Sequence, residues 1–198
     1  MFTVHLVGAS HGKKIAQAFK RLPGYGTVFQ VRSLCESGKT FYDLKWPALE
    51  LLKETDFLVI LPFGNDLIER KYIKRIGNKI HLLNFRPRQS EYFEERYRVL
   101  QEKIDSTVAR VCIITSFYRH FCCNDHFYSG WVGYQNKVNR DLTARFEGTR
   151  VKTLDHRKLI GLPYRKSKDL LEYRKLQTDS VHFSDYRPIA EGILKCAI

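Results

Sequence analysis

The sequence lacks any long hydrophobic run. Its longest apolar stretches, Phe57–Phe63 and Val111–Ile114, are far shorter than the roughly 20 residues that a membrane-spanning helix needs. The chain passes straight into the apolar segment Phe2–Val7, without a basic leader or a cleavage site. We therefore expect a soluble intracellular protein, most simply a cytoplasmic one.

The cysteines show no paired pattern. There are five, an odd number without repeated spacing: Cys35, Cys112, Cys122, Cys123 and Cys196. Adjacent cysteines cannot easily bridge one another, and such a set is typical of free thiols in a reducing compartment. We expect no structural disulfide.

Histidines and cysteines gather between His120 and His126, which raises the question of zinc. Structural zinc sites usually take their ligands as pairs that are two to four residues apart, with a second pair elsewhere in the chain. Adjacent cysteines do not match that pattern. We expect no metal site there, and no other motif indicates a cofactor.

Acidic residues are scarce compared with basic ones. The chain has 34 Lys and Arg against 21 Asp and Glu, a formal net charge of +13, and no arm or tail concentrates the basic residues. Such an excess favours a polyanionic partner, either RNA or an anionic membrane. A solvated surface, or origin as a domain of a larger protein, is the simpler alternative, so the charge suggests a class of partner without selecting one.

The chain has enough hydrophobic residues, 43% of 198, for a well-packed core, and neither a linker nor a repeat divides residues 1–198, which we treat as one domain. Apolar segments predict strands over residues 2–7, 27–31, 57–61, 108–115 and 150–154. Apolar spacing predicts helices within residues 15–22, 44–52, 90–106 (with Ser90 as N-cap), 137–146 and 188–196. Residues 68–88 and 163–178 fit neither pattern.

Strands that are apolar at every position are typical of a parallel sheet with both faces covered. Because they alternate with helices, we expect a three-layer α/β/α sandwich around a parallel sheet of about five strands. In such sheets, ligands bind where loops from separate strands meet at their carboxyl ends. Three polar segments are placed to meet there: residues 8–12, 62–66 and 179–182.

These three segments contain the groups that serine hydrolysis requires. Ser10 lies where a strand passes into a helix, and a serine hydroxyl becomes a nucleophile when a base takes its proton. His182 can be that base, and Asp179, three residues earlier, can orient its imidazole. The side-chain amide of Asn65 can hold the negative oxygen that forms during attack, helped by the helix N-terminus at Ser10.

At these residues the chain resembles the SGNH (GDSL-like) hydrolases. That family has a Gly-Asp-Ser block, an oxyanion glycine, a Gly-x-Asn-Asp block and a late Asp-x-x-His. Ser10, Asn65, Asp179 and His182 match in order and spacing, and Gly38 is the best match to the oxyanion glycine. The resemblance implies a flavodoxin-like sandwich that hydrolyses esters through an acyl-enzyme without a cofactor. It favours short acyl groups, acetyl above all, and lipid esters are also open.

The chain departs from the family pattern at two positions. Ala9 stands where the family has an acid before the nucleophile, and Phe63 stands where it has the glycine of the third block. We expect Phe63 either to narrow the substrate pocket or to alter the geometry of the oxyanion hole. Members of this fold that bind RNA without catalysis typically lack the serine and histidine, so an enzyme is favoured. The alternative is a nucleic-acid-binding module with vestigial catalytic residues.

Within the superfamily, Leu6–His11 and Asp179–Ser184 resemble the esterase domain in the first open reading frame of some LINE-type retrotransposons. Intracellular platelet-activating-factor acetylhydrolases are a more distant comparison. The basic charge suits a retroelement protein.

Several of these residues have a simpler alternative role. Ser10 is a possible helix N-cap, and Asn65 and Gly38 can simply shape turns. Asp66 is expected to steady its loop. His11 is either a polar residue behind the nucleophile or an exposed residue, with a role in substrate binding also open.

The segment Phe117–Tyr134 is rich in aromatic residues and follows a strand at the active-site end. It can form a flap over the substrate, with Trp131 as a contact, or a small core beneath a long loop. Stacking of its aromatic rings and Arg119 on nucleic-acid bases is a further alternative.

Overall fold

The computed structural model describes residues 1–123, 125–161, 175, 177, 179 and 181–197. Its centre is a five-stranded, wholly parallel sheet in the order β2-β1-β3-β6-β7. The strands are β1 (Phe2–Val7), β2 (Phe29–Ser33), β3 (Phe57–Ile60), β6 (Arg110–Ile114) and β7 (Lys152–Leu154). Each crossover returns the chain to the same end of the sheet, so all five carboxyl ends lie at one edge.

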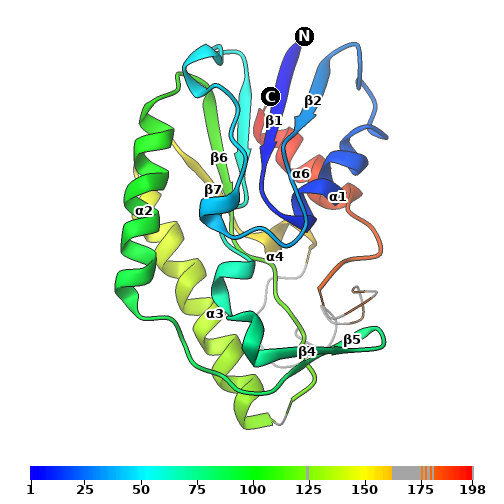
Figure 1. The fold of residues 1–198 in the computed structure, drawn as a ribbon. Helices are drawn as coiled ribbons and strands as arrows, with labels where there is room; N and C mark the ends of the chain where they lie inside the picture. The colour runs from blue at the N-terminus through cyan, green and yellow to red at the C-terminus, as the bar shows by residue number, and fades with distance from the viewer. Residues whose placement is uncertain (124, 162–174, 176, 178, 180, 198) are drawn as a thin grey trace.

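Helices cover both faces of the sheet (Figure 1). α1 (Ser10–Phe19) packs against α6 (Arg187–Ala197) on one side, and the short α4 (His156–Leu159) contacts α6. α2 (Ser90–Asp105) and α3 (Asp125–Phe146) lie on the other side. The expected α/β/α sandwich is therefore confirmed.

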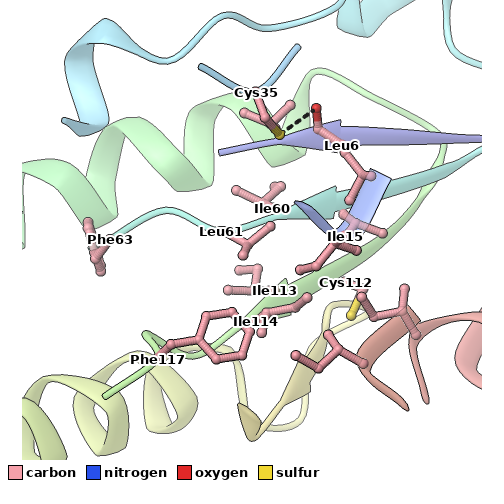
Figure 2. Packing of buried hydrophobic residues seen from close by; sticks show 14 of the residues in the cluster. Leu6, Ile15, Cys35, Ile60, Leu61, Phe63, Cys112, Ile113, Ile114 and Phe117 are labelled. Atoms are coloured by element: carbon pink, nitrogen blue, oxygen red, sulfur yellow. Dashed lines mark hydrogen bonds between the residues drawn. The ribbon is translucent and has the colours of Figure 1, made fainter. Parts of the chain in front are cut away.

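The three central strands form the core and end level with one another. β3 is buried at all four positions, and the register pairs Val7 with Ile60 and Ile60 with Ile113. Figure 2 shows this core, in which Ile15 of α1 packs near the strand side chains. Because the strands stop together, the loops that follow β1, β3 and β6 meet at one place.

Gly12 lets α1 lie close to the sheet. A Cβ at this position would overlap Sγ of Cys35, whose thiol donates to the carbonyl of Leu6 (3.4 Å, Figure 2). We expect Gly12→Ala to lower the free energy of unfolding by about 1–3 kcal/mol, the usual cost of overpacking. Urea unfolding measures the loss. In a Cys35→Ala background the overlap with Sγ is removed and the closest remaining atom is the Cβ of residue 35 at 3.3 Å, so the loss should be smaller; an equal loss there would contradict this contact.

The helix predicted for residues 44–52 is wrong. The structure has two single-turn 3₁₀ helices, η1 (Phe41–Asp43) and η2 (Leu49–Leu51), separated by extended backbone. Pro47 explains the break, because a proline disfavours helical backbone at the residue before it. The leucines of this segment pack on the core without a helix.

Two other expectations need correction. Ser90 is the first residue of α2, and its N-cap is Gln89. α3 begins at Asp125, twelve residues before its expected start at Lys137. Much of the aromatic segment therefore belongs to a helix, with Phe117, Tyr118, Phe121 and Trp131 buried. Of the two structures considered for this segment, a flap over the substrate and a small core, the structure therefore shows the core. The other predicted strands and helices are confirmed, with ends shifted by a few residues.

Residues 68–88, which fit no pattern, follow η3 (Asn65–Leu67) and contain η4 (Arg70–Tyr72) and an antiparallel hairpin. The hairpin strands are β4 (Ile73–Ile76) and β5 (Lys79–Leu82). Most of residues 163–178 lies outside the described residues.

The structure places no disulfide at Cys35, Cys112, Cys122, Cys123 or Cys196. Among the described residues no helix is long and apolar enough to cross a membrane. The assignment of residues 1–198 to one domain stays a prediction.

Candidate active site

Ser10 is placed by the turn from β1 into α1. β1 ends at Val7 and Ser10 is the first residue of α1, with Ala9 at the N-cap position. The alternative of Ser10 as N-cap is therefore wrong. Its half-buried side chain lies at the positive end of the helix dipole, where developing negative charge is favoured.

Asp179 and His182 form a hydrogen-bonded pair. Nδ1 of His182 lies 3.0 Å from Oδ2 of Asp179, and Oδ1 of Asp179 accepts the backbone N–H groups of Val181 and His182, both at 2.7 Å. One carboxylate oxygen thus shapes the loop and the other orients the imidazole. Asp179 and His182 are only three positions apart in the sequence, so a single turn is sufficient to hold both.

The charge of Asp179 fixes the tautomer of its partner. Partial burial raises the pKa of Asp179, but hydrogen bonds from the ring and backbone of His182 and from the Val181 backbone outweigh it, so the pKa lies below its usual value. An ionised carboxylate only accepts hydrogen bonds, so neutral His182 carries its proton on Nδ1. Nε2 then has the lone pair of a general base.

His11 connects this loop to the helix that carries Ser10. Its ring lies 5.3 Å from the ring of His182 and 4.5 Å from that of Phe117, centroid to centroid. Its Nδ1 is 2.7 Å from the hydroxyl of Tyr186, just before α6. Burial, with smaller contributions from neighbouring positive groups such as Arg119, lowers the pKa of His11 well below its usual value, so it is neutral at pH 7. His11 is therefore a buried polar residue and not an exposed one, and its role in substrate binding stays a prediction.

Asn65 and the loop that contains Gly38 meet, although 27 positions separate them in the sequence. Nδ2 of Asn65 donates to the carbonyl of Lys39 at 2.8 Å, and its Oδ1 accepts from Nη2 of Arg119 at 2.7 Å. Gly38 has φ +78°, a left-handed conformation that favours glycine, and its carbonyl accepts from Arg70 at 2.9 Å. An amide has two N–H groups, so Asn65 retains one for another acceptor.

A small cavity of about 20 Å³ lies beside Ser10, enough for about one water-sized group. It is lined by Ser10 and His11, by Phe63 and Gly64 after β3, and by Phe117 and Arg119 after β6. A larger hollow of about 690 Å³ lies between α3, β7 and α4, but none of the proposed reacting groups lines it. The chemistry therefore points to the small cavity.

Phe63 and Asp66 make the loop after β3 rigid. Phe63 is buried, packs edge-on against Phe93 at 5.3 Å between ring centroids and lines the small cavity, while its effect on a substrate stays a prediction. Asp66 is buried and accepts hydrogen bonds from the Phe41 backbone (2.9 Å) and from Nε of Arg96 (3.2 Å). Asp66 steadies its loop, as the sequence suggested.

Arg119 is the site residue whose position the sequence did not reveal. It is 8% exposed, lines the cavity with Ser10 and donates to Asn65. Trp131, expected as a substrate contact, is fully buried instead, and its Nε1 donates to the Arg119 carbonyl at 2.9 Å. Trp131 supports the loop from beneath and does not line the cavity. The one available signal for Arg119 was its position five residues after a buried strand.

The cluster around His120 does not form a metal centre within the described residues. No three His, Cys, Asp or Glu residues there lie close enough to hold an ion. Nδ1 of His120 is 2.6 Å from the Tyr128 hydroxyl, and the backbone of Cys122 pairs with β5.

The chain is similar to known proteins in structure but not in sequence. No family model and no curated protein sequence matches the chain. An acetyl xylan esterase superposes with a TM-score of 0.62 at 18% identity, covering 99% of this chain and all of that one. A putative acylhydrolase from Bacteroides fragilis gives 0.60 at 14% identity, covering 100% and 88%. A lipase/acylhydrolase from Enterococcus faecalis gives 0.57 at 15% identity, covering 100% and 96%.

The chain has the SGNH hydrolase fold. Both chains are covered almost completely in these superpositions, so the similarity extends over the whole sheet and its helices. The identities of 14–18% show the fold alone. They give no support to the expected link with LINE-type retrotransposons.

Proposed function

We propose that the protein is an SGNH-type serine esterase that hydrolyses short acyl esters, acetyl esters above all. The observation that carries this proposal is the Asp179–His182 pair, held at 3.0 Å in a loop that His11 connects to the helix start at Ser10. The structural neighbours support it, because those named above are an acetyl xylan esterase and two acylhydrolases.

The first half of the reaction forms an acyl-enzyme. Nε2 of His182 takes the proton from Ser10, whose Oγ attacks the ester carbonyl carbon. The resulting oxyanion is held by the free amide N–H of Asn65 and by the backbone N–H groups of Gly38 and Ser10. Asp179 stabilises the imidazolium. The C–O bond then breaks, and the departing alcohol takes the proton from His182.

Water completes the cycle. It gives a proton to His182 while its oxygen attacks the acyl carbon, and the same donors hold the second oxyanion. Collapse releases the carboxylic acid and returns the proton from His182 to Ser10. No step requires a metal or a cofactor.

The size of the cavity predicts a preference for acetyl groups. p-Nitrophenyl acetate should be hydrolysed with a kcat/KM about 10–100 times that for the butyrate ester, since two further methylenes would have to displace Phe63 or Phe117. Phe63→Leu should raise the relative rate for butyrate. Faster turnover of octanoate than of acetate by the wild type would contradict a short-acyl substrate. Absence of ester hydrolysis that depends on Ser10 would contradict the function itself.

The hairpin favours a second candidate function, binding of RNA or another polyanion. Residues 70–88 include no Asp or Glu and seven basic residues: Arg70, Lys71, Lys74, Arg75, Lys79, Arg86 and Arg88. β5 buries Ile80 and Leu82 against the protein, while Lys74 and Lys79 point to the opposite, outer face of the ribbon. Neither lysine forms an ion pair with a described residue.

Lys74→Gln with Lys79→Gln should weaken RNA binding and reduce its salt dependence. The matched control is Lys20→Gln with Lys53→Gln, two exposed lysines near the amino ends of the strands, at the opposite end of the sheet. A salt titration of RNA binding measures both variants. Equal weakening by the two variants would contradict a role for the hairpin. Vesicle flotation tests a membrane as the alternative partner. If the protein floats with anionic vesicles but not with neutral ones, and does not bind RNA, the hairpin binds a membrane surface and not RNA.

A further inference from the structure

We propose that Arg119 is a positioning residue for the esterase reaction, which holds the amide of Asn65 in the orientation that stabilises the oxyanion. This inference rests on the proposed esterase function and deepens it. Arg119 belongs to none of the family blocks that identify the nucleophile, the base or the oxyanion donors.

The two hydrogen bonds of Asn65 exclude the flipped orientation of its amide. A guanidinium only donates, so Nη2 of Arg119 must face Oδ1 of Asn65 at 2.7 Å. A carbonyl only accepts, so the oxygen of Lys39 must face Nδ2 at 2.8 Å. Rotation of the amide by 180° would place donor against donor and acceptor against acceptor. The remaining N–H of Asn65 is therefore fixed in one direction.

Arg119 is also a buried cation that contacts no carboxylate among the described residues, although Asp66 and Asp179 attract it from a distance. Its contact with Asn65 is its only side-chain hydrogen bond among the described residues, and it forms no ion pair with them. Burial lowers its pKa to about 10, so the guanidinium remains charged at neutral pH. A buried charge that lacks a partner is costly, because the protein interior solvates it poorly.

The oxyanion that the Asn65 amide would hold forms only during the reaction. The cavity that Arg119 lines is also lined by Ser10, whose attack creates an oxyanion. An oriented amide N–H interacts more strongly with an oxyanion than with a neutral ester, so the Asn65 amide that Arg119 holds stabilises the transition state more than the bound substrate. The effect should therefore appear in kcat more than in KM.

Arg119→Met tests the proposal, because methionine retains an unbranched apolar chain and removes the charge and the donors. With p-nitrophenyl acetate, we expect kcat to fall about 10- to 100-fold while KM changes by less than about threefold. Arg119→Lys should recover part of kcat. Arg140→Met is the matched control, since Arg140 is exposed and does not line the cavity, so the same change of side chain there leaves the site intact; its kcat should stay within about threefold of the wild type.

A double-mutant cycle separates positioning from general loosening of the loop. If Arg119 acts through Asn65, Arg119→Met should have little further effect in an Asn65→Ala background. Additive losses, or an unchanged kcat in Arg119→Met, would overturn the proposal. If the methionine variant does not fold, Arg119→Gln takes its place in the cycle, with the same outcomes. Failure of the esterase function would be seen separately, as a wild type without Ser10-dependent turnover.

Discussion

Ser10→Ala is expected to abolish hydrolysis of p-nitrophenyl acetate, lowering kcat by a factor that is roughly 10⁶ in well-studied serine hydrolases. The loss follows because the Asp179–His182 pair has no proton to take once Oγ is removed. Steady-state release of p-nitrophenol measures it.

The fold should tolerate this change. The helix N-cap is Ala9, so the Ser10 side chain does not cap α1, and alanine is a good helix former. Circular dichroism and the urea midpoint should therefore match the wild type. Turnover unchanged in a folded Ser10→Ala protein would contradict the mechanism.

Asp179→Asn should lower kcat by about 10⁴-fold, as expected when the base is held in the wrong tautomer. The asparagine oxygen can still accept the backbone N–H groups of Val181 and His182, so the loop retains its turn. Its NH₂ group then faces Nδ1 of His182, which must accept a hydrogen bond and carry its proton on Nε2 instead. The ring can no longer remove a proton from Ser10.

The control for this substitution is Asp185→Asn. Asp185 is an exposed acid six residues further on that pairs with Arg187, so its loss removes the same charge from the same region. We expect its kcat to stay close to that of the wild type. Equal effects of the two substitutions would indicate a general electrostatic role and contradict the orienting role of Asp179.

The framework of the site was predictable because it depends on short-range patterns. An apolar run such as β3 identifies a central strand without knowledge of its neighbours. The pairing of Asp179 with His182 needs only one turn of backbone, so their spacing was sufficient to predict it. The contact of His11, next to Ser10, with His182 in this distant loop followed from the rule that the carboxyl ends of parallel strands share one edge.

Arg119 could not be predicted, because its role depends on the path of the loop after β6. Nothing local distinguishes it from exposed arginines such as Arg140, and its burial follows from the Trp131 contact beneath it. The hairpin was missed for a related reason. Ile73 and Arg75 lie on one face with Ile80 and Leu82, so the expected alternation of apolar and charged residues is interrupted.

The position of the aromatic segment Phe117–Tyr134 also depends on long-range packing. A sequence rich in rings after a strand is compatible with a flap or with a core, because both need large apolar side chains. The early start of α3 at Asp125 places Trp131 inside, where it supports the Arg119 loop. For residues 44–52 a local effect was decisive instead. The leucines there have helical spacing, but Pro47 disfavours a helix, so the predicted helix does not form.

Covalent labelling by a fluorophosphonate probe tests the central claim most directly, because it reports an activated serine without knowledge of the substrate. We predict that the probe labels the wild-type protein at Ser10, identified by the mass of the modified peptide, and that His182→Ala labels far more slowly. Labelling at another serine, or none at all in the folded wild-type protein, would contradict the assignment of Ser10 as nucleophile.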